Sequence, residues 1–114
     1  MCRRWVGSAL VCLSVKPDDL RYGGPVQNFA SSDWAERGFC GTCGSSLWYH
    51  LKAGEHESYE LCAGLFEDAA GLTVTKEIYI DHKPAGFAFA GDHLRQTRAE
   101  ALASYGITDP EGDD

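Results

Sequence analysis

The sequence predicts a mainly β domain of short antiparallel strands, with one short helix near its C-terminus. Short apolar or alternating segments recur between turn-forming residues, which is the pattern of a strand-rich fold. Thirteen glycines among 114 residues favour turns and short strands over long helices. A helix-start pattern, Thr-x-x-Glu, stands at residues 97–100 and is followed by helix-forming residues.

The first three predicted strands lie in the N-terminal third of the chain. Residues 8–16 are apolar and partly β-branched, and Pro17 ends this segment. Residues 20–22 form a shorter candidate that closes at a Gly-Gly-Pro turn, and residues 26–30 carry apolar side chains in loose alternation. A Ser-Ser-Asp turn over 31–33 follows these strands.

Three more strands are predicted in the centre of the chain. Residues 46–51 are apolar and aromatic, and residues 58–63 alternate as a half-buried strand does. A loop over 68–71 precedes residues 72–81, whose β-branched and aromatic content is again typical of a strand.

A short helix is predicted over 98–105. The hydroxyl of Thr97 can accept a hydrogen bond from the backbone of Glu100, and the Glu100 side chain can reach back to Thr97. The alanines and Leu102 that follow are strong helix formers, and Gly106 is a natural stop.

Length and charge limit the classes of protein to consider. We expect one domain over 1–108 and an acidic, disordered tail over 109–114. A formal net charge of −7 with scattered basic residues argues against a nucleic-acid-binding surface. No segment is long enough for a transmembrane helix, and no secretory signal is visible. Five cysteines, an odd number, argue against a disulfide framework, so we expect a cytoplasmic protein with reduced thiols.

The most informative motif is Cys40-Gly41-Thr42-Cys43-Gly44. Two residues between cysteines let both thiolates face one point at zinc–sulfur distances of ~2.3 Å, and the glycines allow the tight turn this requires. Apolar strand-like residues follow the motif, whereas a redox Cys-x-x-Cys pair opens a helix. Zinc binding is therefore the favoured interpretation over a redox pair or a chance pairing.

The remaining cysteines and one histidine are weaker candidates. Cys2 beside the initiator methionine can be an exposed thiol without a role. Cys12 and Cys62 lie in apolar segments, where cysteine usually acts as a small core residue, although either could serve as a substitute metal ligand. His82 and Lys83 lie in a charged turn that either lines a cleft or simply ends a strand on the surface.

Four stretches together resemble the glutathione-dependent formaldehyde-activating enzyme family, also called the centromere-protein-V-like family. Residues 2–10 resemble the end of its Cys-x-Cys-x-x-Cys segment, and residues 36–50 resemble its Phe-Cys-x-x-Cys-Gly segment. Residues 77–92 resemble a strand followed by Lys-Pro and an aromatic cluster, and residues 97–106 fit the family's end.

The resemblance implies a zinc-stabilised "β-tent" fold with two zinc sites. Cys40 and Cys43 match half of the structural site, and Cys2 matches the last ligand of a catalytic three-cysteine site, which favours a role for Cys2. The family's two upstream Cys-x-Cys pairs would precede Met1, so we expect either a reading frame that starts at the wrong methionine or an N-terminally truncated form that lacks the first strands. Such a form would need substitute ligands or a homodimer, because structural zinc supplies folding free energy.

The activity that the resemblance implies is that of a zinc-dependent carbon–sulfur lyase. Such an enzyme acts on adducts of glutathione, or of another thiol, with formaldehyde or a related small aldehyde. Cys2 would be the surviving catalytic ligand, and Arg4, His82 and Lys83 are the expected contacts to an anionic substrate. The alternatives are a non-catalytic zinc-stabilised binding module or decayed relative, a chromatin-associated protein, which the charge of −7 disfavours, and a thiol redox protein.

Overall fold

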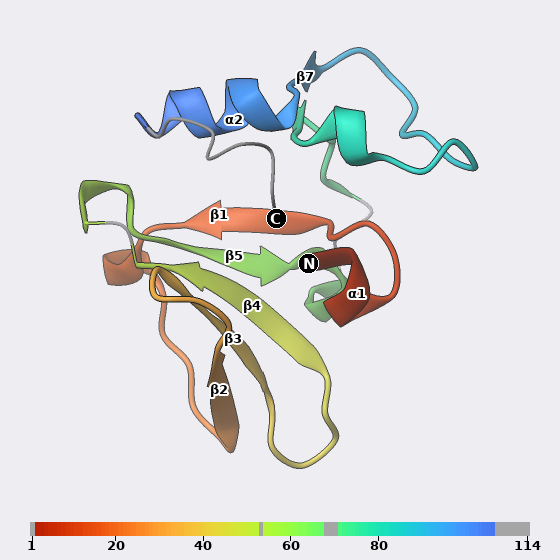
Figure 1. Cartoon of the computed structure of the whole chain (residues 1–114). Coiled ribbons are helices and arrows are strands. Elements are labelled where there is room, and N and C mark those ends of the chain that lie inside the picture. Colours follow the sequence, from red (N-terminus) through yellow and green to blue (C-terminus); the bar gives the residue numbers. More distant parts are fainter. Residues whose placement is uncertain (1, 53, 68–70, 107–114) are drawn as a thin grey trace. The chain divides into compact units, whose positions relative to one another are not determined.

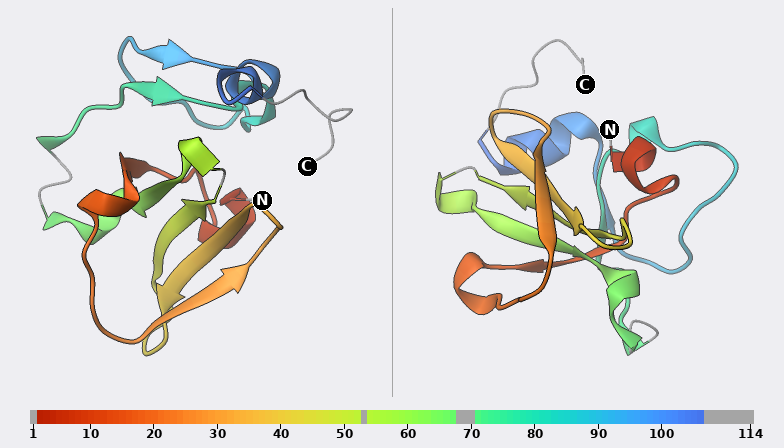
Figure 2. Two further views of the ribbon diagram at one scale, coloured as in Figure 1. Left: turned by 90° about the vertical axis from the view of Figure 1, so that its left-hand side faces the viewer. Right: turned by 90° about the horizontal axis from the view of Figure 1, so that it is seen from below.

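The computed structural model describes residues 2–52, 54–67 and 71–106. The chain divides into two compact units, Met1–Ala69 and Ala70–Asp114, each of which is described by itself (Figures 1 and 2). One domain over 1–108 stays a prediction. The expected acidic tail, and most of the expected loop over 68–71, lie outside the described residues.

The first unit is built on a five-stranded antiparallel sheet with the strand order β1-β5-β4-β3-β2 (Figure 1). β1 and β2 form its two edges, and every neighbouring pair is antiparallel. The strands are β1 (Cys12–Val15), β2 (Val26–Ala30), β3 (Ala35–Cys40), β4 (Ser46–Leu51) and β5 (Ser58–Cys62). A mainly antiparallel β fold is therefore confirmed.

Trp48 at the centre of β4 organises one face of this sheet. Its indole is 4% exposed and packs against Tyr22, with ring centroids 4.6 Å apart, and edge-on against Tyr59. Gly38 lies opposite Trp48 on β3, and a Cβ atom placed on it would lie 2.4 Å from Nε1 of the indole. Glycine at this position is therefore required for the indole to lie flat on the neighbouring strand.

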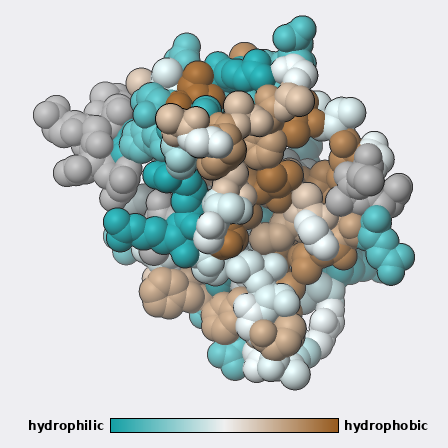
Figure 3. Space-filling model, turned by 90° about the vertical axis from the view of Figure 1, so that its right-hand side faces the viewer, coloured by the Kyte–Doolittle hydropathy of each residue, from teal (hydrophilic) through white to brown (hydrophobic). Residues whose placement is uncertain are grey.

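The sheet leaves many apolar side chains at the surface. No large side chain among the described residues is fully buried, and several apolar ones are more than 40% exposed. Figure 3 shows apolar side chains beside polar ones on one face of the molecule. In the first unit the exposed apolar residues are Val11, Tyr22, Phe29, Trp34, Leu65 and Phe66.

The helices of the first unit are short. α1 (Cys2–Val6) ends at Gly7, which has a φ of 84° and donates its N–H to the carbonyl of Arg3. This left-handed glycine closes the helix in the usual way. The described part of this unit also contains the 3₁₀ turns η1 (Pro17–Asp19), η2 (Gly54–His56) and η3 (Ala63–Leu65).

The second unit contains α2 (Arg98–Ser104), which confirms the helix predicted near the C-terminus. The Thr97 hydroxyl accepts from the Glu100 amide at 3.2 Å, and the Glu100 carboxylate accepts from the Thr97 amide at 2.8 Å. A two-stranded parallel pair, β6 (Lys76–Glu77) and β7 (Leu94–Arg95), and the turn η5 (Ile80–His82) complete it. No helix in the described part of the chain is long and apolar enough to cross a membrane.

The strand predicted over 72–81 is wrong for most of its length, because only Lys76–Glu77 forms a strand there. Tyr79 adopts a left-handed conformation with a φ of 58°, and the chain then turns into η5. Asp81 uses its carboxylate to accept from the backbone N–H of Arg98 at 2.8 Å. These local contacts oppose the extended conformation that the β-branched composition favours.

Other boundaries differ as well. The strand predicted over 20–22 is wrong, because no strand forms beside Gly23 and Gly24. The strand predicted over 8–16 is shorter in the structure, at Cys12–Val15. β3 and α1 were not expected. α1 has only five residues, too few for a helical repeat to show in the sequence.

Candidate functional site

The strand register places four polar or aromatic side chains in one row across the sheet. Arg37 pairs with Tyr49, Tyr49 pairs with Glu60, and Glu60 pairs with Ser14. Paired residues share a face of a sheet, so this row lies on the face opposite to Trp48. α1 contacts the same face, because two of its side chains touch Arg37.

Arg37 is the centre of this arrangement. The residue is 5% exposed, and its Nη1 donates a hydrogen bond to the Sγ atom of Cys2 at 3.3 Å. Its guanidinium also lies 5.0 Å from the ring centroids of both Trp5 and Tyr49, within the range of cation–π contacts. The contacts of this one side chain therefore fix α1 on the sheet.

The charge of Arg37 has no carboxylate partner among the described residues. Its Nε atom is buried and has no hydrogen-bond partner in that same part of the chain. A buried charge without a counter-ion is costly, and a guanidinium binds carboxylates and other anions through its forked N–H groups. This face of the sheet is therefore suited to receive an anion beside the Cys2 sulfur.

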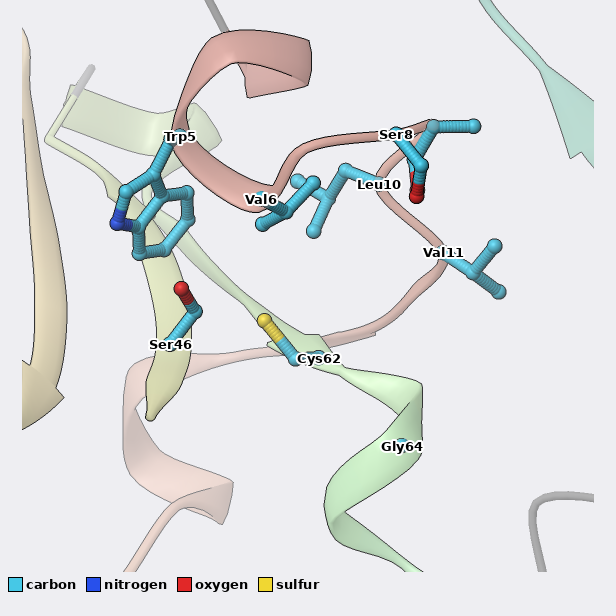
Figure 4. A pocket seen from close by; sticks show the side chains of 9 residues that line it. Trp5, Val6, Ser8, Leu10, Val11, Ser46, Cys62 and Gly64 are labelled. Carbon is cyan, nitrogen blue, oxygen red and sulfur yellow. The ribbon is translucent and has the colours of Figure 1, made fainter. Parts of the chain in front are cut away.

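A pocket of about 360 Å³ adjoins this arrangement (Figure 4). Trp5 contributes to its wall and also contacts Arg37, so one indole connects the pocket to the guanidinium. The Cys62 sulfur and the Ser46 hydroxyl point into the space below α1 (Figure 4). Its other walls include Val6, Leu10 and Gly64.

Cys40 and Cys43 lie in the tight connection between β3 and β4. The Cys40 sulfur accepts hydrogen bonds from the backbone amides of Thr42 and Cys43, each at 3.4 Å. Gly44 donates to the Cys40 carbonyl at 2.8 Å and has a φ of 80°, which requires glycine. The motif therefore joins two strands and does not open a helix, unlike a thioredoxin-like redox pair.

The Cys43 side chain is also suited to bind a metal ion as a thiolate. The side-chain and backbone hydrogen bonds of Ser45, together with a contact from Cys40, lower the pKa of Cys43 below its ordinary value. The Cys43 sulfur lies 3.1 Å from the Ser45 hydroxyl oxygen. A lowered thiol pKa favours the thiolate, which is the form that binds metal.

The residues of the motif fit two positions of a four-ligand zinc site. Among the described residues, no group of three or more His, Cys, Asp or Glu side chains could hold a metal ion. Cys40 and Cys43 lie in one turn, and their joint binding of zinc stays a prediction; a three-thiol site around Cys2 is not formed by the described part of the chain.

The predicted substrate contacts are distributed over both units. Arg4 is exposed on α1, one residue before Trp5. His82 ends η5 in the second unit, and Lys83 donates from Nζ to the carbonyls of Pro84 and Phe87 at 3.1 and 2.7 Å. Participation of Arg4, His82 and Lys83 in one site with Cys2 stays a prediction.

Sequence reasoning missed Arg37, Trp5 and Tyr49. The available signal was an arginine within a stretch of strand directly before the cysteine motif. Because β3 was not recognised, the face on which Arg37 lies could not be assigned. The helix that brings Cys2 and Trp5 to it was not recognised either.

The family model of the glutathione-dependent formaldehyde-activating enzyme matches residues 1–82. The chain belongs to this family. The match covers the whole first unit, including Cys2, Arg37 and both motif cysteines, and it reaches His82 in the second. Members of this family are generally zinc-binding.

A curated relative supports the same assignment to the formaldehyde-activating enzyme family. An uncharacterized lyase of Schizosaccharomyces pombe is 31% identical over 104 residues, which cover 90% of this chain and 75% of the relative. No solved structure matches the chain significantly. The family is thus assigned from sequence, and the arrangement of Cys2 and Arg37 comes from the structure alone.

Proposed function

We propose that this chain is a lyase-like enzyme that makes or breaks a carbon–sulfur bond between a thiol and a small aldehyde. The reaction is the reversible addition of a thiol to a carbonyl: the sulfur bonds to carbon, and the thiol proton goes to the carbonyl oxygen. The family match and the name of the yeast relative support the reaction type. Glutathione with formaldehyde, or with a related small aldehyde, is the proposed substrate pair.

The observation that carries this proposal is the contact between Arg37 and Cys2. A buried guanidinium that has no carboxylate partner among the described residues donates to a sulfur atom at 3.3 Å, so a positive charge lies directly beside a thiol. An adduct that carries carboxylates can bind to such a charge, and binding orients its sulfur for reaction. Arg37 is therefore proposed to position Cys2 and to attract the anionic substrate.

Zinc belongs to this proposal through Cys40 and Cys43, whose turn and hydrogen bonds suit two thiolate ligands. A zinc ion with an open position supplies Lewis acidity and keeps a thiol ionised. The described residues do not complete a catalytic zinc site. The roles proposed in the reaction are therefore those of the protein's own side chains. Arg4, His82 and Lys83 remain proposed contacts to the anionic substrate.

The experiment is to measure interconversion of glutathione, formaldehyde and S-hydroxymethylglutathione by exchange spectroscopy, with and without the protein. The zinc-loaded protein should accelerate exchange above the spontaneous rate, and Arg37→Gln should lose most of that acceleration. Arg3→Gln, which changes an exposed charge on α1, the helix that Arg37 contacts, is the matched control. Exchange at the spontaneous rate with the zinc-loaded protein would exclude this substrate pair.

The cysteine motif supports a second candidate, a non-catalytic zinc-stabilised binding module. Its amide-to-sulfur hydrogen bonds stabilise a turn between β3 and β4 and need no substrate. A module of this kind would bind glutathione or its adducts without changing their rate of exchange. Titration of glutathione followed by calorimetry, beside the exchange measurement, separates binding from catalysis.

A further inference from the structure

Cys12 and Cys62 lie directly opposite each other on β1 and β5. One residue beyond this pair, the Ala63 amide donates to the Val11 carbonyl at 2.9 Å. Hydrogen-bonded and non-hydrogen-bonded pairs alternate along an antiparallel ladder, so the two cysteines form a non-hydrogen-bonded pair. In such pairs the Cα atoms are about 4.5 Å apart and the side chains are at their closest.

The next pair on this face shows that side chains meet across the two strands. Ser14 and Glu60 are also a non-hydrogen-bonded pair, two residues further along. The Ser14 hydroxyl lies 2.7 and 2.6 Å from the two Glu60 carboxylate oxygens, so the side chains of this row contact directly. Cys12 and Cys62 have the same relation, and both thiols are free.

We infer that Cys12 and Cys62 form an intramolecular disulfide site. Disulfides span Cα separations of about 4.4–6.8 Å, a range that includes the separation expected for this pair. A rotation of the two side chains is enough to join the sulfurs, because the strands are already paired. The inference is independent of the proposed lyase activity, which uses neither thiol in its chemistry.

The oxidant is a small-molecule disulfide, with glutathione disulfide as the test reagent. Cys12 lies on the exposed edge strand, and Cys62 is half-buried beside the pocket (Figure 4). One of the two sulfurs attacks the reagent as a thiolate and releases one glutathione, which leaves a mixed disulfide. The other cysteine sulfur then displaces the second glutathione. Two thiol protons leave with the two reduced glutathiones, so the two cysteines are oxidised by two electrons.

The test is oxidation of the folded chain by glutathione disulfide, followed by alkylation, trypsin digestion without reduction, and mass spectrometry. Trypsin places the pair in separate peptides, 5–21 and 53–76, and places Cys40 and Cys43 together in 38–52. The expected product is the link between 5–21 and 53–76, at least tenfold above any other link between peptides. The loss of two hydrogens from this pair distinguishes it from two bound glutathiones.

Matched variants make the result decisive. Cys43→Ser should leave the link intact, and Cys12→Ser should abolish it and leave Cys62 carrying a glutathione or an alkyl group. Oxidation in denaturant should spread the links over all pairs, which shows that the native strands select this one. Separate adducts on the two cysteines of the folded chain, or links that prefer Cys2, would overturn the inference. Because the readout is a mass and not an activity, a failed lyase assay leaves this result unaffected.

Discussion

Nη1 of Arg37 donates a hydrogen bond to Sγ of Cys2 at 3.3 Å, and thereby connects residues 35 positions apart in the chain. The contact joins the first turn of α1 to the middle of the sheet, at the side of a buried guanidinium. The stability of α1 on the sheet and the proposed substrate binding therefore depend on the same side chain.

Replacement of Arg37 by Gln should destabilise the first unit. The substitution removes the donor to Cys2 and the charge that Trp5 and Tyr49 contact, so we expect a loss of about 1–3 kcal/mol in the free energy of unfolding. Denaturant titration followed by circular dichroism measures the change. Arg3→Gln, at an exposed position, should change it by less than about 0.5 kcal/mol. An Arg37→Gln variant as stable as the parent would show that α1 is fixed by other contacts.

Gly38→Ala should be destabilising because of Trp48. The added Cβ would lie 2.4 Å from Nε1 of an indole that is only 4% exposed, so the indole or the strand must shift. We expect a cost of about 1–3 kcal/mol, as for other overpacked cores. Thermal unfolding measures it, with Gly23→Ala as the control, because no atom lies within 4 Å of that added Cβ. Equal melting temperatures for the two variants would contradict the packing described for Trp48.

Features of the fold that depend on neighbouring residues can be predicted from the sequence, and features that depend on distant contacts cannot. The ends of β2 and β4 and the capping box of α2 depend on neighbouring residues, and all three were predicted correctly. β3 was missed because Glu36, Arg37 and Gly38 give it no apolar alternation, although the sheet encloses it on both sides. Within 72–81, the left-handed Tyr79 and its 3₁₀ turn override strand composition, and nothing in the local pattern indicates them.

The candidate functional site shows the same difference between local and long-range contacts. Cys40 and Cys43 are three residues apart, so the turn that brings them together is readable from their spacing and glycines. Arg37 meets Cys2 only after β3 has paired within the sheet and α1 has folded onto it. Cys12 and Cys62 likewise lie opposite each other only through strand pairing across 50 positions, and from the sequence they were expected to be separate core residues or substitute metal ligands.

Glu77 should make the second unit sensitive to acid. Its pKa is lowered below the ordinary value, chiefly by the hydrogen bond with His93 and then by the charges of His93 and Arg95. A lowered folded-state pKa means that the ionised form stabilises the fold. This stability is present above the unfolded-state pKa of about 4.3 and is lost as the pH falls through the folded-state value.

Melting temperatures of the parent chain and Glu77→Gln, measured between about pH 3 and pH 7, test this expectation. The variant should be less stable near neutral pH, and its stability should fall less steeply below about pH 4.5. Glu67→Gln, at an exposed position in the other unit, should follow the parent curve. Parallel curves for the parent and Glu77→Gln would show that the carboxylate does not stabilise the folded state.

Zinc content should depend on the cysteine motif. Cys43→Ser removes one of two paired thiolates, so zinc per chain, measured by elemental analysis after dialysis, should fall. Because structural zinc contributes folding free energy, the melting temperature should fall with it. Cys12→Ser, in another part of the sheet, should keep the zinc content of the parent. Equal zinc in Cys43→Ser and the parent would place the metal away from the motif.

The disulfide between Cys12 and Cys62 should form faster as the pH rises. Burial is the largest cause that raises the pKa of Cys12 to about 12, although the residue as a whole is exposed at the sheet edge. The Glu60 carboxylate and the sulfurs of Cys62 and Cys2 add to this effect, and burial also raises the pKa of Cys62. The thiolate is the attacking form, so each unit of pH up to about 10 should increase the rate several-fold.

Glu60→Gln provides the sharper test, because it removes a negative charge beside Cys12 and leaves the strand pairing in place. The link should then form faster at pH 8, and the difference should shrink as the pH approaches the thiol pKa. Once formed, the link closes a loop of about 50 residues and should stabilise the first unit by up to about 4 kcal/mol. A melting temperature that falls on oxidation would show that the sulfurs meet only by distorting β1 and β5.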